Sequence, residues 1–233
     1  MVSAALLLLA AVQLAMLAAV PRGPRAPAGA SPSPLAAPSA PLPALLLVAV
    51  GAGLAYDSAI FGAGAFVGEG DPLHRLSVPR YVGHAFLTPL LVVWAATLVR
   101  RRAWAVVLAA VLVAWGLVVE LASLSLEPET YAGTLRYVHA EPGGPPIPAI
   151  VVIVVLFGVG VAVWRRDRAP WLALGSLVMF AASAVAFQMP PLGNLGEAVL
   201  FAAIVWTART AGNGEAPRAG HAGLRRSGRA GSG

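Results

Sequence analysis

The chain contains a succession of apolar segments, each about as long as a membrane-spanning helix. A helix needs roughly 17 to 25 apolar residues to cross a ~30 Å hydrocarbon core. Six segments meet this requirement, and residues 3–20 are a seventh candidate; the six are 43–66, 81–99, 103–124, 147–164, 169–189 and 194–209. The composition agrees, since 58% of the residues are hydrophobic and 11% are charged, against about 25% charged in soluble domains. We predict an all-α, polytopic integral membrane bundle of seven transmembrane helices, with six as the alternative.

Two short arginine-rich turns, at residues 100–102 and 165–168, separate neighbouring spans and predict two antiparallel helix pairs. Basic residues in short loops stay on the cytoplasmic side of a membrane. With both turns inside, thirteen of the sixteen arginines are cytoplasmic, and only Arg75, Arg80 and Arg136 are outside. The sequence therefore predicts that the N-terminus is outside and the C-terminus inside, with most acidic residues toward the outer face.

Residues 1–20 could be a retained first span or a secretory signal peptide. A signal peptide has a positively charged start, which this chain lacks, and its cleavage would force both arginine turns outside. We favour a retained span. The remaining organisation is a Pro/Ala-rich cytoplasmic linker at 21–42, a six-helix core at 43–209 and a Gly/Arg-rich cytoplasmic tail at 210–233 that we expect to be disordered.

The chain lacks two residue types, which excludes several kinds of cofactor site. The chain has no cysteine, so iron–sulfur clusters and thiolate metal sites are excluded, and it has no lysine to form a retinal Schiff base. Nucleotide-binding, hydrolase and zinc-protease motifs are also missing, so any reaction must take place within the membrane. The Ala/Gly/Pro/Arg bias is typical of a GC-rich genome. We expect a bacterial cytoplasmic (inner) membrane protein surrounded by lipid bilayer, with no nucleic-acid partner and with a cofactor that stays unknown.

Asp57 is the most informative polar residue within a predicted span. It lies about ten residues from the outer end of segment 43–66, roughly 15 Å deep at ~1.5 Å per residue. A carboxylate there costs about 2.5–3.5 kcal/mol and usually faces the bundle or a wet cavity. Gly51, Ala55, Ser58 and Gly62 form an adjacent stripe of small residues, which lets another helix approach closely and could bind a membrane-protein partner. The alternative is a structural, hydrogen-bonded Asp57.

Arg80, His84 and Thr88 follow one another at intervals of four residues and therefore share one face of the next helix. By helical rise Thr88 and Asp57 reach similar depth, so these side chains could lead inward to Asp57. Arg80 could instead lie at the membrane boundary with its head group in water. Glu120 lies about one turn inside the outer end of segment 103–124. The candidate acid/base or ligand-binding residues are Asp57, His84 and Glu120, with Arg80, Thr88 and Tyr56 as further binding residues.

The outer loops carry further polar residues. A metal site could gather from separate segments, and its candidate ligands are His74, His84, His139 and Asp57. Segment 68–80 is rich in turn residues, so we expect an ordered cap or a re-entrant piece rather than a long helix. Segment 125–146 is expected to be a loop. Asn194 and Glu197 follow Pro190-Pro191 with the spacing of a capping box at a helix start.

These patterns leave three classes of function. The first is an outward-facing intramembrane pocket that binds or processes a lipid, an isoprenoid-type molecule or another small ligand, with or without catalysis. The second is a small cation or proton transporter, which intramembrane Asp and His residues would suit. The third is a non-catalytic scaffold or assembly subunit. Because the polar residues gather in the outer half and the inner half is apolar, the sequence favours the first.

Overall fold

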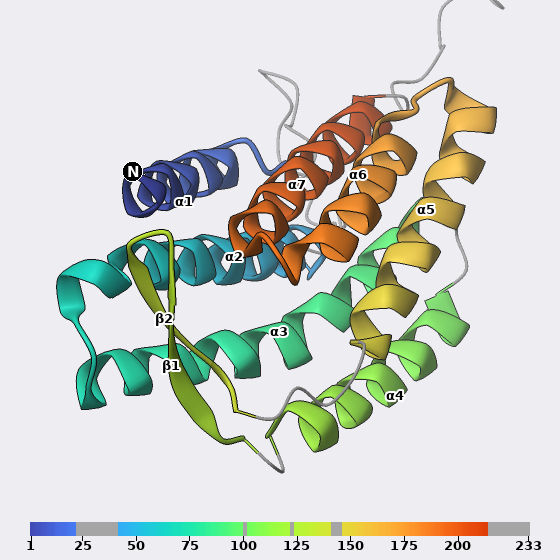
Figure 1. Cartoon of the computed structure of the whole chain (residues 1–233). Helices are drawn as coiled ribbons and strands as arrows, with labels where there is room; N and C mark the ends of the chain where they lie inside the picture. Colours follow the sequence, from blue (N-terminus) through green and yellow to red (C-terminus); the bar gives the residue numbers. More distant parts are fainter. Residues whose placement is uncertain (22–41, 100–101, 122–123, 141–145, 214–233) are drawn as a thin grey trace, which may run out of the picture.

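The structure is a computed structural model that describes residues 1–21, 42–99, 102–121, 124–140 and 146–213 (Figure 1). The predicted linker and tail lie almost wholly outside these residues. The described chain is helical except for one two-stranded hairpin. Its elements are α1 Val2–Ala18, α2 Leu42–Val67, α3 Asp71–Leu98, α4 Arg102–Leu121, β1 Leu126–Tyr131, β2 Thr134–His139, α5 Ile147–Asp167, α6 Trp171–Ala186 and α7 Pro190–Asn213.

Four helices are long and apolar enough to cross a membrane: α2, α3, α5 and residues Pro190–Ala211 of α7. Three further apolar helical stretches are shorter, namely Val2–Ala18, Ala103–Val118 and Trp171–Ala186. Each of the seven predicted spans therefore coincides with a helix. The helical class and the membrane-embedded character agree with the prediction.

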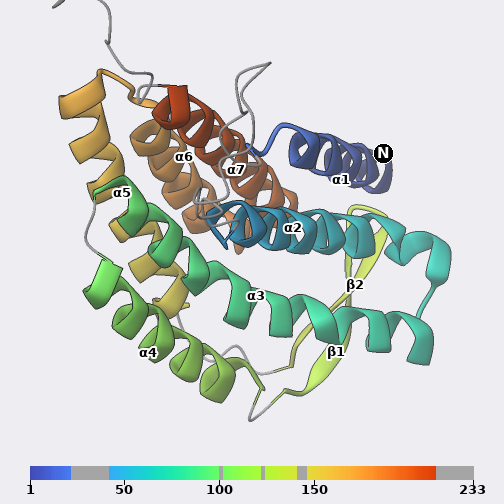
Figure 2. The ribbon, with the colours of Figure 1, turned by 180° about the vertical axis from the view of Figure 1, so that it is seen from behind.

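Consecutive helices run in opposite directions, and small residues let them approach closely. On α2, a Cβ atom at Gly51 would overlap Leu17, and one at Gly62 would press on Leu7, so α1 lies antiparallel along α2. The glycines of the α2 stripe are thus covered from within the chain. α1 lies against α2 on one side, and α4 lies against α3 on the other (Figures 1 and 2).

The last turns of α3 and α5, each next to a predicted arginine turn, lie at the same end of the bundle. Arg166 donates from Nη1 to the carbonyl oxygen of Leu98 at 3.0 Å, so the last turns of α3 and α5 meet. Arg166 also pairs with Asp167 at 2.6 Å. Toward this end the interior is apolar, with Val92, Leu156 and Phe201 fully buried. Residues 100–101 of the first turn lie outside the described residues.

The interpretation of segment 68–80 as a cap or re-entrant piece was wrong, because α3 begins at Asp71 and continues through Pro79 and Pro89. Pro72 occupies the first turn of the helix, where a missing N–H group costs nothing. Ser77 stays within the helix and donates from Oγ to the Leu73 carbonyl at 2.8 Å. The helix therefore starts ten residues earlier than the predicted span 81–99, which changes the depth of every side chain on it.

Segment 125–146, expected to be a loop, contains the antiparallel hairpin β1–β2, which turns through Ala132 and Gly133 at positive φ. The hairpin is fixed on α2, since Thr134 donates from Oγ1 to the Phe61 carbonyl at 2.8 Å. A Cβ atom at Gly64 would overlap the Leu135 carbonyl, so the two backbones touch there. The hairpin crosses α2 and α3 near the end where they join (Figure 1).

Candidate functional site

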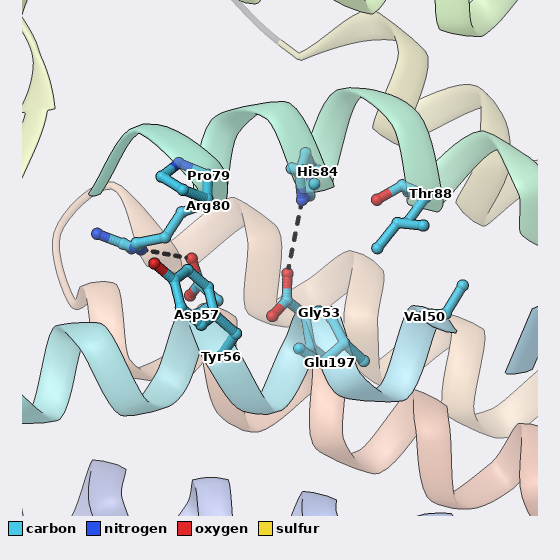
Figure 3. Close-up of a pocket in the computed structure, with 12 residues that line it drawn as sticks. Val50, Gly53, Tyr56, Asp57, Pro79, Arg80, His84, Thr88 and Glu197 are labelled. Atoms are coloured by element: carbon cyan, nitrogen blue, oxygen red, sulfur yellow. Dashed lines mark hydrogen bonds and ion pairs between the residues drawn. The ribbon is translucent and has the colours of Figure 1, made fainter. Parts of the chain in front are cut away.

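A small polar cavity lies between α2 and α3, with α7 behind them (Figure 3). Its volume is about 50 Å³, enough for a few water-sized groups. Its polar lining comes from α2, α3 and α7, and its remaining lining is apolar or glycine; the residues are Val50, Gly53, Leu54, Tyr56, Asp57, Pro79, Arg80, Gly83, His84, Leu87, Thr88 and Glu197.

Asp57 is held at both carboxylate oxygens. Arg80 donates from Nε to Oδ1 at 2.7 Å, and Asn194 donates from Nδ2 to Oδ2 at 2.6 Å. The Asn194 amide also lies 3.3 Å from the Ser58 hydroxyl, which is fully buried. Charge-assisted hydrogen bonds of this kind are short and strong. Asp57 therefore joins three helices and faces the bundle, as the cost of an intramembrane carboxylate predicts.

The Arg80 head group is buried within the bundle. Its side chain is 11% exposed, and it meets Asp57 about nine residues into α3. Thr88 lies deeper, because Gly53 on α2 already packs against Leu87. Arg80, His84 and Thr88 do line one cavity, but Asp57 lies at the level of Arg80, so the prediction that these side chains lead inward to Asp57 was wrong. The reason is the earlier start of α3, which the proline-rich sequence of its first turns concealed.

His84 faces a second acidic residue, Glu197 of α7. The His84 Nδ1 atom lies 4.0 Å from Glu197 Oε1, and the two side chains are 43% and 17% exposed (Figure 3). An imidazole and a carboxyl group at this distance can share a proton through one bridging hydroxyl or water-sized group. Asp57 and Arg80 hold the helices together, while the His84 imidazole and the Glu197 carboxyl face each other across the cavity.

Two buried polar atoms at the cavity have no hydrogen-bond partner among the described residues. They are Nη1 of Arg80, a donor, and Oε2 of Glu197, an acceptor. Buried groups of this kind are costly when unpaired and usually have a partner in a working protein. Arg80 and Glu197 both line the cavity, and each keeps one polar atom for which the described residues supply no partner.

Asn194 and Glu197 belong to the site and were misread in the sequence as a helix cap. Helix α7 begins at Pro190, so Asn194 lies one turn inside the helix and Glu197 almost two. Their side chains reach Asp57 and His84 instead of the helix start. Their spacing of three residues places both on one helix face, and that signal could have identified them.

The other predicted site residues are distributed as follows. Tyr56 lines the cavity and donates from its hydroxyl to the Leu76 carbonyl at 2.8 Å. His74 contacts Tyr137 edge-on, and His139 contacts Tyr81 in the same way. The Glu120 side chain lies outside the described residues. Within the described part of the chain, no three His, Asp or Glu side chains group closely enough to hold a metal ion.

The inner end of the cavity is closed by apolar packing. Val50, Leu54 and Leu87 line it, and below them lies the main apolar core, which includes Leu91 and Val92. Two buried hydroxyl residues nearer the arginine end, Ser176 and Thr207, donate to carbonyls of their own helices. The described residues therefore form a pocket that ends within the bundle.

Comparison with known proteins gives no match, whether to a family model, to a curated protein or to a solved structure.

Proposed function

We propose that the chain is a multi-pass protein of a bacterial cytoplasmic membrane that binds a small ligand in the pocket between α2, α3 and α7. The ligand carries a hydroxyl or amine group and is either a free small molecule or the head group of a lipid or isoprenoid-type molecule. The observation that carries the proposal is that two residues lining one cavity, Arg80 and Glu197, each keep a buried polar atom, Nη1 and Oε2, without a partner among the described residues.

In this proposal all seven helices cross the membrane, with the N-terminus outside and the C-terminus inside. The alternating directions of α1 with α2 and of α6 with α7 support seven crossings. The contact between Arg166 and Leu98 supports a common side for both arginine turns, which the distribution of basic residues makes cytoplasmic. The pocket then opens toward the outer face.

The hydrogen-bonding groups of the pocket define the ligand. Arg80 already donates to Asp57, so its remaining Nη1 can donate to a hydroxyl oxygen. Glu197 can accept from an amine or hydroxyl, while an anion beside the Asp57 carboxylate would be repelled. A group that both donates and accepts, such as the amino alcohol of ethanolamine, matches the hydrogen-bonding chemistry of both atoms. The ~50 Å³ volume admits only such a group, so a longer chain would stay outside.

Proton binding is the second candidate, and the 4.0 Å approach of His84 to Glu197 favours it. In this alternative the His84–Glu197 pair would bind one proton from the outer side and release it to the same side. Transport across the membrane has less support, because the described inner half offers apolar packing below Thr88 rather than a polar track. A scaffold role through the α2 glycine stripe also has less support, because α1 already covers Gly51 and Gly62.

Cysteine accessibility tests the pocket, since the native chain contains no cysteine. Thr88→Cys places a thiol on the pocket wall, and Thr97→Cys places one in α3 near the arginine end. We expect Thr88→Cys to react with a small cationic methanethiosulfonate applied from outside, and more slowly with its anionic analogue. We expect Thr97→Cys not to react from outside. A Thr88→Cys thiol that reacts only from the inside would overturn an outward-opening pocket.

Protection experiments then test the ligand and its source. Ethanolamine in solution and sphingosine in vesicles, whose head group is a free amino alcohol, are added separately before labelling of Thr88→Cys. Protection by ethanolamine identifies a free small molecule, and protection by the lipid alone identifies a head group. Glu197→Gln should abolish protection in both cases. If neither probe protects, or if Glu197→Gln is protected as well as the parent, the proposed ligand class is wrong.

Impermeant labelling tests the topology separately. In intact cells Glu69→Cys should be labelled by a membrane-impermeant maleimide, whereas Ser227→Cys should be labelled only after the cells are opened. The intact mass of the purified protein decides whether residues 1–20 are retained. The opposite labelling pattern would reverse the bundle in the membrane and place the pocket on the cytoplasmic side.

A further inference from the structure

A second hollow lies on the outside of the bundle, between α6 and α7 toward the arginine end. Its volume is about 440 Å³, within the usual range of ligand sites. The lining is almost entirely apolar and shares no residue with the polar pocket; it consists of Trp171, Leu174, Gly175, Val178, Val199, Ala202, Ala203 and Trp206. Any ligand here is therefore independent of the function proposed above.

The hollow is shaped by small residues between two tryptophans. Gly175 lets α6 and α7 touch, because a Cβ atom there would lie 2.6 Å from Ala203 Cβ. At one end Trp171 and Trp206 meet edge-on with ring centroids 6.1 Å apart, and about half of each side chain is exposed. Tryptophan concentrates at the boundary between lipid chains and head groups. The tryptophan end thus corresponds to the boundary and the rest of the groove to the lipid chains.

Each of the two tryptophans has an arginine three residues away in the sequence, at the end of the groove that corresponds to the boundary. Arg168 lies three residues before Trp171, at the αL end of α5, and Arg209 lies three residues after Trp206 on α7. Both side chains are exposed. Because the two tryptophans touch, the two arginines come from neighbouring helix ends. The groove is therefore apolar along its length and has cationic residues at one end.

We infer that this groove binds one acyl chain of an anionic phospholipid, whose phosphate lies near Arg168 and Arg209. A chain fits between the helices where Ala202 and Ala203 leave room, and the arginines attract an anionic head group. A partner helix would bury the same apolar surface but would gain nothing from two cations at the boundary. The charge therefore favours lipid over protein.

Tryptophan quenching by brominated lipids tests the inference on the full chain in vesicles. Phosphatidylglycerol and phosphatidylcholine with the same brominated chains are compared at equal fractions. We expect phosphatidylglycerol to quench at roughly thirtyfold lower fraction, as two arginines near a lipid surface predict. Trp171→Phe with Trp206→Phe should remove this difference, while the other four of the six tryptophans continue to report general lipid contact.

Three variants separate the contribution of charge from that of the groove's shape. Arg168→Gln with Arg209→Gln should abolish the preference for phosphatidylglycerol, whereas Arg75→Gln, an equally exposed change at the opposite end, should preserve it. Ala202→Phe fills the groove without touching the Gly175 contact and should reduce quenching by both lipids. Equal quenching by the two lipids in the parent chain would overturn the inference. The inference would also be overturned if the preference for phosphatidylglycerol survived the Arg168 and Arg209 substitutions. The same holds if the tryptophans of the Ala202→Phe variant were quenched as strongly as those of the parent chain.

Discussion

Two arginine–aspartate pairs, one in the polar pocket and one at the arginine end, show how position changes the role of the same residue types. Arg80 and Asp57 are 11% and 27% exposed and join α3 to α2. Arg166 and Asp167 are 55% and 39% exposed and are neighbours in sequence. Their shortest N–O distances are almost equal, at 2.7 and 2.6 Å. The comparison teaches that distance alone does not measure what an ion pair contributes, because solvent weakens the exposed pair.

Breaking the buried pair is expected to give the largest effect. Asp57→Asn leaves the Arg80 guanidinium buried without its counter-charge, and we expect a loss of about 3–5 kcal/mol in the free energy of unfolding. Unfolding of the purified protein by sodium dodecyl sulfate in mixed micelles measures it. Asp167→Asn is the matched control and should cost less than about 1 kcal/mol.

The double variant Asp57→Asn with Arg80→Gln sharpens the test. If the ion pair is what matters, the double variant should be less destabilised than the sum of the two single variants, because neither partner is then left charged and buried. Equal losses for Asp57→Asn and Asp167→Asn would show that the pocket is as well solvated as the bundle surface.

The apolar interior near the arginine end should respond to lost volume instead of lost charge. Leu156 on α5 is fully buried, and Leu156→Ala should cost about 2–5 kcal/mol because it opens a cavity. Val154, two residues away, is 58% exposed, so Val154→Ala should change the unfolding free energy far less. The same micelle titration serves both. Similar losses would mean that the Val154 face is also buried, for instance against another protein.

The next largest loss of stability is expected where the backbones of the hairpin and α2 touch. Gly64→Ala places a methyl group on the Leu135 carbonyl and should cost about 1–3 kcal/mol, as overpacking usually does. Gly158→Ala in α5 is the control, because a Cβ atom there meets no neighbour within 4 Å. Protease cleavage at the hairpin should become faster only in Gly64→Ala. Unchanged cleavage would show that the hairpin does not depend on this contact.

Physical rules explain which parts of this site the sequence could predict. Asp57, Arg80 and His84 stood out because charge inside an apolar span is costly and because residues four apart share a helix face. Asn194 and Glu197 were missed because the helix was expected to begin after Pro190 and Pro191. It begins at Pro190, so both residues lie inside it. The depth of Arg80 depended on where α3 begins, and local turn residues predict such boundaries poorly. The hairpin is stabilised by contacts with α2 and α3, which no local pattern reveals.

The smallest effect on stability is expected at His84, and it separates binding from folding. His84 is 43% exposed and approaches Glu197 only to 4.0 Å, so His84→Ala should change the unfolding free energy by no more than about 0.5 kcal/mol. The same change removes a side chain from the pocket wall beside Thr88. In the Thr88→Cys background, His84→Ala should therefore speed labelling by both the cationic and the anionic reagent. Slower labelling, or a stability loss as large as that of Asp57→Asn, would show that His84 supports the helices instead of lining an open pocket.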